Sequence, residues 1–242
     1  LAAPYTFKGG TFPGVGGTCS ASLAAAANCT VVVTYSPIAT GVHSETLDLN
    51  YNNGFAADTA SRDLQGTGAD PAFILISNNP IYDYGTLTVG SDADGTLTLN
   101  NTGGVPAAGI VSSGLAAPYT FAGGSYPGTG GTCGASINAA SSCTVVINFN
   151  PSVTGSFNDT VQFDYNDGVV AQVATRDLTG AAGTAAILAI NEAPSYDFGT
   201  QPLGSNTDYS FTVSNTGGGD ASAVSGLGLA APFSYKDGSY PG

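Results

Sequence analysis

The feature that most constrains this chain is an internal repeat of 114 residues. Leu1–Tyr5, Leu115–Tyr119 and Leu229–Phe233 all read Leu-Ala-Ala-Pro followed by an aromatic residue, and each begins 114 positions after the one before. A pair of cysteines that leads into an alternating segment recurs with the same offset, at Cys19–Tyr35 and Cys133–Phe149. A repeat of this length suits a compact domain with its own core, whereas solenoid units are only about 20–50 residues long.

Within each copy, large apolar residues alternate with polar ones in short segments. Thr46–Tyr51 shows this pattern, as does its counterpart Thr160–Tyr165, and an Asn-Gly or Asp-Gly dipeptide soon follows each. A period of two marks a half-buried strand, and these dipeptides are strong hairpin signals. About seven or eight such short strands per copy, separated by frequent turn signals, predict an all-β chain of two-sheet sandwiches.

Acidic residues dominate the charge of the chain. Four Lys and Arg residues stand against 17 Asp and Glu residues, which gives a net charge of −13 at pH 7. Such a surface repels polyanions, so nucleic acid is not an expected partner. The sequence has no apolar run of about 18 residues, so we expect no membrane insertion.

The four cysteines form two pairs at equivalent positions of the repeat. We expect disulfides Cys19–Cys29 and Cys133–Cys143, because even and phased pairing is typical of a disulfide framework. A zinc site is the alternative, but the spacing within each pair is not a zinc spacing. Because disulfides persist in oxidising compartments, we expect the chain to be extracellular or on the cell surface.

Taken together, the motifs of one copy resemble the choice-of-anchor D repeat, which is akin to the abnormal-spindle/hydin (ASH) immunoglobulin-like domains. The residues that carry the resemblance are Tyr84-Gly85, Gly90-Ser91, Asn101-Thr102-Gly103, Cys133, Cys143-Thr144, Phe149, Pro151, Gly155 and Leu178-Thr179-Gly180. One departure is Ala182, where Gly68 stands in the first copy. The resemblance implies tandem immunoglobulin-like β-sandwich domains in bacterial secreted or surface proteins. It also implies a role as spacer, adhesive module or part of a fibre, without catalytic residues.

If the domain begins near Asp70, the phase of the repeat divides the chain into three parts. Residues 70–183 are then one complete immunoglobulin-like domain, residues 1–69 the back half of a domain, and residues 184–242 the front half of the next. A half sandwich exposes its inner face and its strand edges. We therefore expect these halves to meet further copies of the same sequence, either in a longer covalent array or by strand complementation. The alternative is a cut piece with frayed ends.

Acidic turn residues are weak candidates for a metal site. Asp92 and Asp94, and Asp208 in the next copy, look like part of a calcium loop, but the glutamate and the spacing of an EF-hand are missing. A solvated turn is the alternative, and no other cofactor is expected.

A phased arginine is the second candidate. Arg62-Asp63 recurs as Arg176-Asp177, and no other positive charge is shared by these two copies. A ligand-binding arginine is conceivable, but we expect a structural pair that ties a strand to a neighbouring carboxylate.

Catalysis is not expected. His43 is the only histidine, its counterpart is Phe157, and no triad or general-base arrangement can be drawn around it, so we expect it on the surface. The sequence favours a structural repeat of an extracellular fibre or surface stalk whose partners are copies of itself. The alternatives are an adhesin module that binds a glycan or protein on another surface, and a non-catalytic accessory domain of a secreted enzyme.

Overall fold

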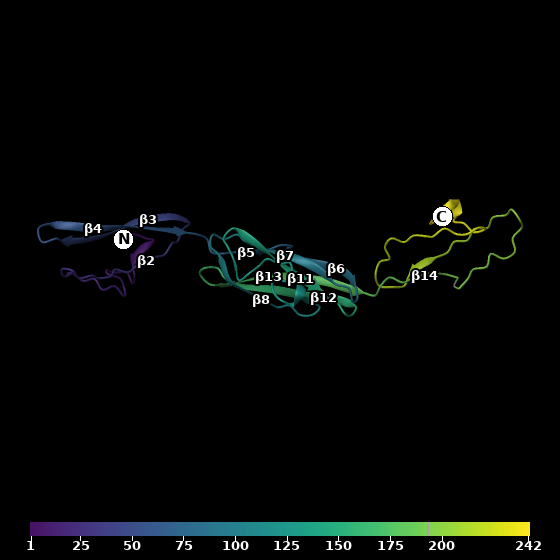
Figure 1. Ribbon diagram of the computed structural model, residues 1–242, viewed down its shortest axis with the longest axis horizontal. Helices are drawn as coiled ribbons and strands as arrows, with labels where there is room; N and C mark the ends of the chain where they lie inside the picture. The colour runs from purple at the N-terminus through teal and green to yellow at the C-terminus, as the bar shows by residue number, and fades with distance from the viewer. Residues whose placement is uncertain (193) are drawn as a thin grey trace.

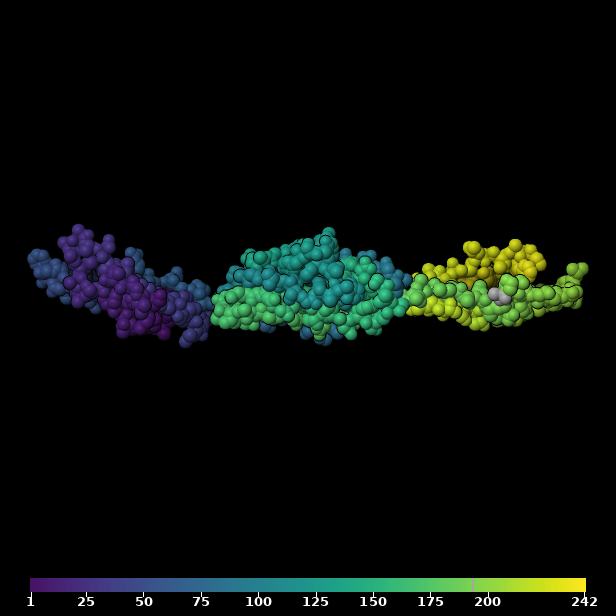
Figure 2. Space-filling view, turned by 90° about the horizontal axis from the view of Figure 1, so that it is seen from below, coloured from purple at the N-terminus to yellow at the C-terminus, as the bar shows by residue number. Residues whose placement is uncertain are grey.

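The computed structural model describes residues 1–192 and 194–242, and it shows three parts in a row (Figure 1). We call them the N-segment (residues 1–69), the central sandwich (residues 70–183) and the C-segment (residues 184–242). The space-filling view shows that the molecule is elongated, with the two segments on opposite sides of the central sandwich (Figure 2). No helix among the described residues is long and apolar enough to cross a membrane.

The central sandwich is built from two sheets. One has five strands in the order β10-β8-β12-β13-β6, and the other has four in the order β5-β7-β11-β9. All neighbouring strands are antiparallel except β6 and β13, which are parallel. The bounds are β5 (Ile74–Ile76), β6 (Ile81–Thr88), β7 (Ala93–Asn101), β8 (Ala107–Ser113), β9 (Tyr119–Phe121), the 3-10 turn η1 (Ala122–Gly124), β10 (Ser136–Ile137), β11 (Ser141–Phe149), β12 (Gly155–Asn166) and β13 (Ala171–Gly183).

A long hairpin joins β12 to β13, as the sequence pattern predicts. Gly168 lies in its turn with a φ of 98°, a conformation that glycine adopts without a steric cost. Val161, Phe163 and Tyr165 alternate along β12 and are all buried. The period of two therefore places these side chains on the inner face of the five-stranded sheet.

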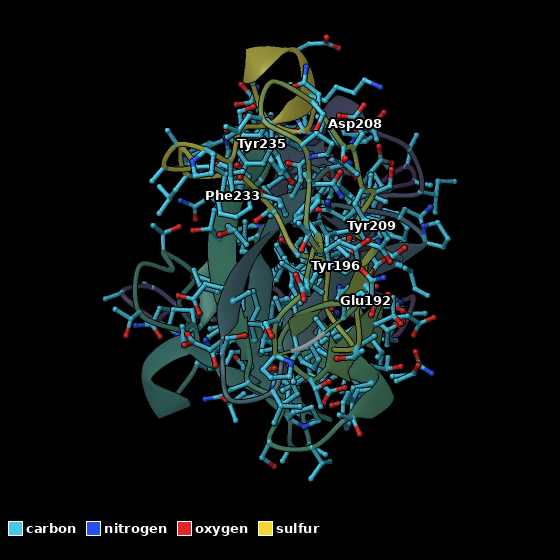
Figure 3. All side chains as sticks on the ribbon, turned by 90° about the vertical axis from the view of Figure 1, so that its right-hand side faces the viewer. Glu192, Tyr196, Asp208, Tyr209, Phe233 and Tyr235 are labelled. Carbon is cyan, nitrogen blue, oxygen red and sulfur yellow. A yellow bond between two sulfur atoms is a disulfide. The ribbon has the colours of Figure 1, made fainter. Side chains whose placement is uncertain are left out.

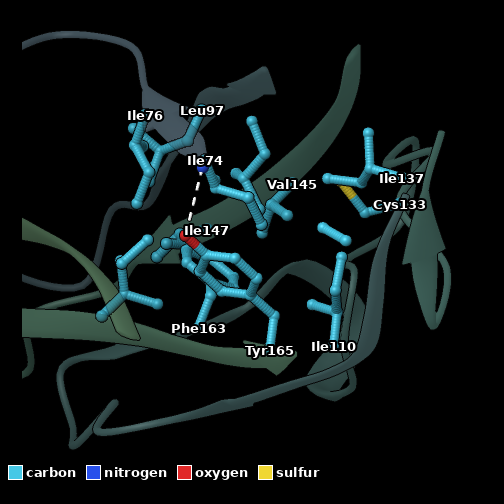
Figure 4. Close-up of a cluster of buried hydrophobic side chains, with 14 of the residues drawn as sticks. Ile74, Ile76, Leu97, Ile110, Cys133, Ile137, Val145, Ile147, Phe163 and Tyr165 are labelled. Carbon is cyan, nitrogen blue, oxygen red and sulfur yellow. Dashed lines mark hydrogen bonds between the residues drawn. The ribbon is translucent and has the colours of Figure 1, made fainter. Parts of the chain in front are cut away.

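Apolar side chains from both sheets form one continuous core (Figure 4). The Ile74 amide of β5 donates to the Tyr165 hydroxyl of β12 at 3.3 Å, which joins the two sheets across this core. The largest side chains with less than 2% exposure are Tyr119, Phe149, Phe163, Leu97, Leu99, Ile147, Leu178, Val145, Val161, Asn101 and Pro151.

Phe149 lies at the centre of an aromatic cluster within this core. Its ring centroid is 4.8 Å from that of Tyr119, 5.4 Å from Tyr84 and 5.9 Å from Phe157. The Tyr84 hydroxyl donates to the Ile147 carbonyl at 2.8 Å, and the Tyr119 hydroxyl donates to the Phe157 carbonyl at 3.0 Å. Burial raises the pKa of Tyr119 to about 12, so its hydroxyl stays a protonated donor at neutral pH.

The two segments contain fewer strands. In the N-segment β1 (Tyr5–Phe7) pairs with β2 (Val33–Tyr35), and β3 (Gly41–Asn52) pairs with β4 (Ala57–Gly68). In the C-segment β14 (Leu188–Ile190) pairs with β15 (Val213–Asn215), and the 3-10 turn η2 (Lys236–Gly238) follows. The strands β1, β3 and β5 have the same lengths as β9, β12 and β14 and lie 114 positions before them.

The expectation of an all-β chain is confirmed, but strand lengths differ between the copies. The alternating segment that ends at Tyr35 forms a strand only over Val33–Tyr35, whereas its counterpart β11 covers Ser141–Phe149. β11 is flanked by β7 and β9, whereas β2 pairs only with β1 among the described residues. Strand length therefore follows from the available neighbours as well as from the local sequence.

Candidate functional site

The core-side face of the C-segment is open. Leu188, Ile190 and Val213 are 45%, 57% and 48% exposed, whereas the residues 114 positions earlier are 4%, 8% and 0% exposed. Soluble proteins rarely expose a contiguous apolar surface without a partner for it. We therefore take this face as one half of the candidate functional site.

The core-side face of the N-segment is open in the same way. Tyr51 is 49% exposed, whereas its counterpart Tyr165 is 6% exposed. Leu47, Leu49 and Leu64 are half-buried, although their counterparts in the central sandwich are fully buried. We call this surface, formed by the inward residues of β1–β4, the acceptor face.

Two strands of the N-segment also have open backbone edges. Among the described residues β3 and β4 pair only with each other, whereas their counterparts β12 and β13 each have a second neighbour, β8 and β6. The unpaired N–H and C=O groups of an open edge favour addition of another strand. The acceptor face therefore offers both apolar surface and hydrogen-bonding groups.

Arg176 shows what the phased arginine does inside a closed sandwich. Its guanidinium donates to the carbonyls of Pro80 and Ile76, each at 2.6 Å, and to the side-chain oxygen of Asn79 at 3.0 Å. Arg176 is only 7% exposed and thus ties β13 to the connection between β5 and β6. Its counterpart Arg62 is exposed, and no hydrogen bond or ion pair joins its side chain to another of the described residues.

The aspartates beside these arginines have other partners. The Thr160 hydroxyl donates to Asp177 at 2.7 Å, and the Thr46 hydroxyl donates to Asp63 at 3.0 Å. Successive residues of a strand point to opposite faces, so an arginine and the aspartate after it cannot meet. The oxygens that receive the Arg176 guanidinium belong to carbonyl and amide groups, in place of the carboxylate expected from the sequence.

Asn101, which belongs to the Asn-Thr-Gly motif of the repeat, has a structural role in the core. It is fully buried, and its side chain donates to the carbonyls of Ile137 and Asn138 at 3.1 and 3.2 Å. Its counterpart Asn215 is exposed and donates to the Gly219 carbonyl at 2.7 Å. The sequence signal for this buried role is that both copies, at Asn101 and Asn215, keep an asparagine at a strand position whose side chain points inward.

The acidic turn residues are held by protein donors. The Asn148 amide donates to Asp92 at 3.0 Å and to Asp94 at 2.7 Å, and Lys236 lies 2.9 Å from Asp208. Within the described parts of the chain, no group of three or more His, Cys, Asp or Glu residues is placed to hold a metal ion.

His43, which was expected on the surface, is half-buried. Its Nδ1 atom is 2.8 Å from the Tyr35 hydroxyl, and its carbonyl accepts from the Tyr5 hydroxyl at 2.9 Å. It occupies the repeat position of Phe157 and lies beside Tyr35 as Phe157 lies beside Phe149. His43 is therefore part of the aromatic packing of the N-segment.

Aromatic residues of the C-segment pack against one another (Figure 3). The Tyr196 and Tyr209 rings stack with their centroids 3.9 Å apart, and the Tyr209 hydroxyl donates to Glu192 at 3.2 Å. Phe198 lies 5.9 Å from Phe233, a residue that is 55% exposed. These rings thus remain largely at the surface.

Comparison with known proteins gives structural likeness at low sequence identity. No family model matches the sequence, and no curated protein matches it. An ASH / PapD-like domain of human CEP192 matches with 18% identity and a TM-score of 0.36, over 46% of this chain and 86% of that one. A protein of unknown function from Porphyromonas gingivalis W83 matches with 15% identity and a TM-score of 0.37, over 66% of this chain and 79% of that one. The VesB protease of Vibrio cholerae matches with 10% identity and a TM-score of 0.36, over 45% and 31% of the two chains. These scores are low, so the fold described above rests on the strand order of this chain itself.

Both expected disulfides are present. Cys19 is bonded to Cys29 and Cys133 to Cys143, with Cα–Cα distances of 4.8 and 4.9 Å. Cys29 precedes β2 and Cys143 lies in β11, and Cys133 is buried in the core (Figure 4). The pairing indicates an oxidising environment.

Replacement of both Cys133 and Cys143 by alanine is expected to lower the free energy of unfolding of the central sandwich by about 1–3 kcal/mol. The bond closes a short loop, so the constraint that it places on the unfolded chain is worth at most about 3 kcal/mol. Denaturant unfolding, followed by the near-ultraviolet circular dichroism of the buried tyrosines, measures the loss. The matched control removes Cys19 and Cys29, and it should leave the central transition in place; equal effects of the two double variants would contradict the prediction.

The turn between β12 and β13 gives a pH-dependent prediction. Hydrogen bonds from the Val170 amide, the Gln172 side chain and the Val169 amide hold the pKa of Asp167 below its ordinary value of 3.8. The carboxylate therefore contributes stability that is present above pH 3.8 and is lost as the pH falls through the lowered pKa. Asp167→Asn should lose stability less steeply in this acid range. Parallel curves of unfolding free energy against pH for the two proteins would refute it.

Proposed function

We propose that this chain is a non-enzymatic structural repeat of an extracellular fibre or surface stalk. Residues 70–183 act as one complete immunoglobulin-like domain, residues 1–69 as the back half of a domain, and residues 184–242 as the front half of another. The observation that carries the proposal is the pair of open core-side faces, one on the back half of the repeat in the N-segment and the other on the complementary front half in the C-segment. Residues that are buried in the central sandwich have exposed counterparts in both segments.

Two further features support this role. The connections between the parts are short, because β4 ends at Gly68 and β5 begins at Ile74, while β13 ends at Gly183 and β14 begins at Leu188. At the two ends of the central sandwich, the Gly104 amide donates to the Asp70 carbonyl at 3.0 Å and the Val89 amide donates to the Gly183 carbonyl at 2.9 Å, so the residues where both connections attach are held in place. Short connections favour an extended spacer over a flexible string of domains. The two disulfides agree with a place outside the cell.

Imaging tests the proposal. Antibodies raised against the central sandwich should label filaments or stalks on cells that make the protein, and images of these filaments should show an axial spacing set by one repeat. Labelling confined to the cell interior would contradict the proposal. So would a dispersed globular protein that binds a surface glycan, which is the result expected for an adhesin module.

A further inference from the structure

The repeat identifies which strands would complete the acceptor face. In the central sandwich, residues 70–114 supply β5, β6, β7 and β8, and these strands pack on β9–β13. The acceptor face carries the counterparts of β9 and β11–β13, and β5 already has its counterpart in β14 of the C-segment. We infer that the acceptor face binds residues 184–192 and 194–228 from the C-segment of a second copy of this chain. The inference rests on the proposed function and names its partner.

The C-segment of the same chain cannot fill the acceptor face. The acceptor face and β14 lie on opposite sides of the central sandwich, as both views show (Figures 1 and 2). Within one chain, the short connections on either side of the sandwich prevent the two segments from meeting. A head-to-tail contact of this kind uses two different surfaces and leaves both outer surfaces free, so it propagates into a filament.

The closed sandwich gives the register of the contact. β6 runs parallel to β13 with Tyr82 opposite Leu178 and Thr86 opposite Ala181. Shifted by one repeat, the same register places Tyr196 of one copy opposite Leu64 of the other. It also places Thr200 opposite Thr67. The open edge of β4 then gains the parallel neighbour that its counterpart β13 has.

The exposed apolar residues of the two segments meet in this arrangement. Ile190 and Val213 take the places of Ile76 and Leu99, which are 8% and 0% exposed in the closed sandwich. Tyr51 takes the place of Tyr165 and thus receives a hydrogen bond from the Leu188 amide, as Tyr165 does from Ile74. The contact buries the residues that both segments now expose.

Arg62 is the polar anchor of the contact. The equivalent guanidinium of Arg176 donates to the carbonyls of Ile76 and Pro80, each at 2.6 Å. One repeat later these carbonyls belong to Ile190 and Pro194 of the incoming copy. In the register set by the apolar residues, the exposed Arg62 side chain can therefore donate to two carbonyls, those of Ile190 and Pro194.

Charge complementarity adds a second polar contact. In the C-segment Lys236 lies 2.9 Å from Asp208, although both side chains are exposed. Lys8 occupies the same repeat position as Lys236, and the acceptor face already contains β1, which ends beside it. Once the two segments combine, Lys8 can replace Lys236 as the cation beside Asp208, and residues 229–242 are left outside the joined sandwich.

One residue of the C-segment departs from the template of the central sandwich. Tyr209 stands where the central sandwich has Gly95, and a Cβ atom at Gly95 would lie 2.6 Å from the Tyr84 hydroxyl and 2.7 Å from the Tyr82 ring. The counterpart of Tyr84 is Phe198, which lacks that hydroxyl, but the counterpart of Tyr82 is Tyr196, which keeps the ring and stacks on Tyr209. The joined sandwich must therefore pack Tyr196 and Tyr209 differently from their counterparts in the central sandwich.

Engineered disulfides test the register. The full chain with Thr67→Cys and Thr200→Cys should form a ladder of covalent oligomers under mild oxidation, because these positions are neighbours across the inferred contact. The control pairs Thr67→Cys with Ser195→Cys, which lies on the same incoming strand but opposite Asp63. No ladder from the first pair, or equal ladders from both pairs, would overturn the inferred contact.

One-sided variants test the direction of assembly. Leu64→Asp blocks the acceptor face and Ile190→Asp blocks the incoming segment, so each variant alone should remain monomeric by analytical ultracentrifugation. An equimolar mixture should stop at dimers, since a single competent contact remains. Arg62→Gln should raise the dissociation constant by about 10- to 100-fold, whereas Asp63→Asn on the opposite face should leave it unchanged. A monomeric wild-type chain would overturn the inference, whereas labelled filaments with a one-repeat spacing would still uphold the proposed function.

Discussion

Replacing Phe149 by alanine is expected to lower the free energy of unfolding of the central sandwich by about 3–5 kcal/mol. The Phe149 side chain is fully buried between Tyr84, Tyr119 and Phe157, so its removal leaves a cavity that these large rings cannot fill by small movements. The packing around the ring is tight, because a Cβ atom at Gly180 would lie 2.7 Å from it. Denaturant unfolding with hydrogen exchange of the β11 amides measures the effect.

The repeat supplies the control for this experiment. Tyr35 occupies the equivalent position of the N-segment, where it is only half-buried and contacts Tyr5 and His43. Tyr35→Ala should leave the exchange of the β11 amides unchanged, because the described contacts of Tyr35 lie within the N-segment and distant sites act independently. If Phe149→Ala unfolds the sandwich by less than the control does, the ring is not the centre of the core.

Much of the fold follows from period-two alternation read together with the repeat. Leu47 and Val161 sit at the same phase of equivalent strands, and both point to the inner side of a hairpin, as the alternation predicts. The disulfides could also be predicted, because paired cysteines recur at fixed positions beside a strand. Such features depend on short stretches of sequence, which is why they can be recognised without coordinates.

Other features depend on residues far apart in the sequence. The carbonyl acceptors of Arg176, at Ile76 and Pro80, lie 100 and 96 residues away in the sequence, and no local pattern marks a backbone carbonyl as the partner of an arginine. The same holds for Asn101, whose partners at Ile137 and Asn138 become neighbours only when β10 pairs with β8. A polar residue repeated at an inward position indicates that a buried partner exists, but it does not indicate which one.

The open faces explain why one repeat unit can have three structures. Each of the three copies of the aromatic position after Leu-Ala-Ala-Pro meets different neighbours. Tyr119 is 1% exposed in the closed sandwich, Tyr5 is 3% exposed beside β2, and Phe233 is 55% exposed in the C-segment. Burial of this ring thus follows the strands available for packing, because β2 covers Tyr5 within the N-segment whereas Phe233 is left 55% exposed in the C-segment.

Replacing Arg176 by methionine is expected to lower the free energy of unfolding of the central sandwich by about 3–4 kcal/mol. Methionine keeps much of the length of the side chain, but it leaves the carbonyls of Ile76 and Pro80 without a donor in a buried place, and hydrogen bonds to a charged group are worth about 1.5–3 kcal/mol each. Part of this loss is offset, because the buried guanidinium has no carboxylate partner and its Nε atom has no hydrogen-bond partner. Arg62→Met is the matched control, and in dilute solution it should change the same quantity by less than about 0.5 kcal/mol because Arg62 is exposed. Denaturant unfolding of both variants measures this loss. If Arg176→Met is as stable as the parent, the hydrogen bonds from the guanidinium to the carbonyls only offset the cost of its burial. The repeat would then keep this arginine for a reason other than stability.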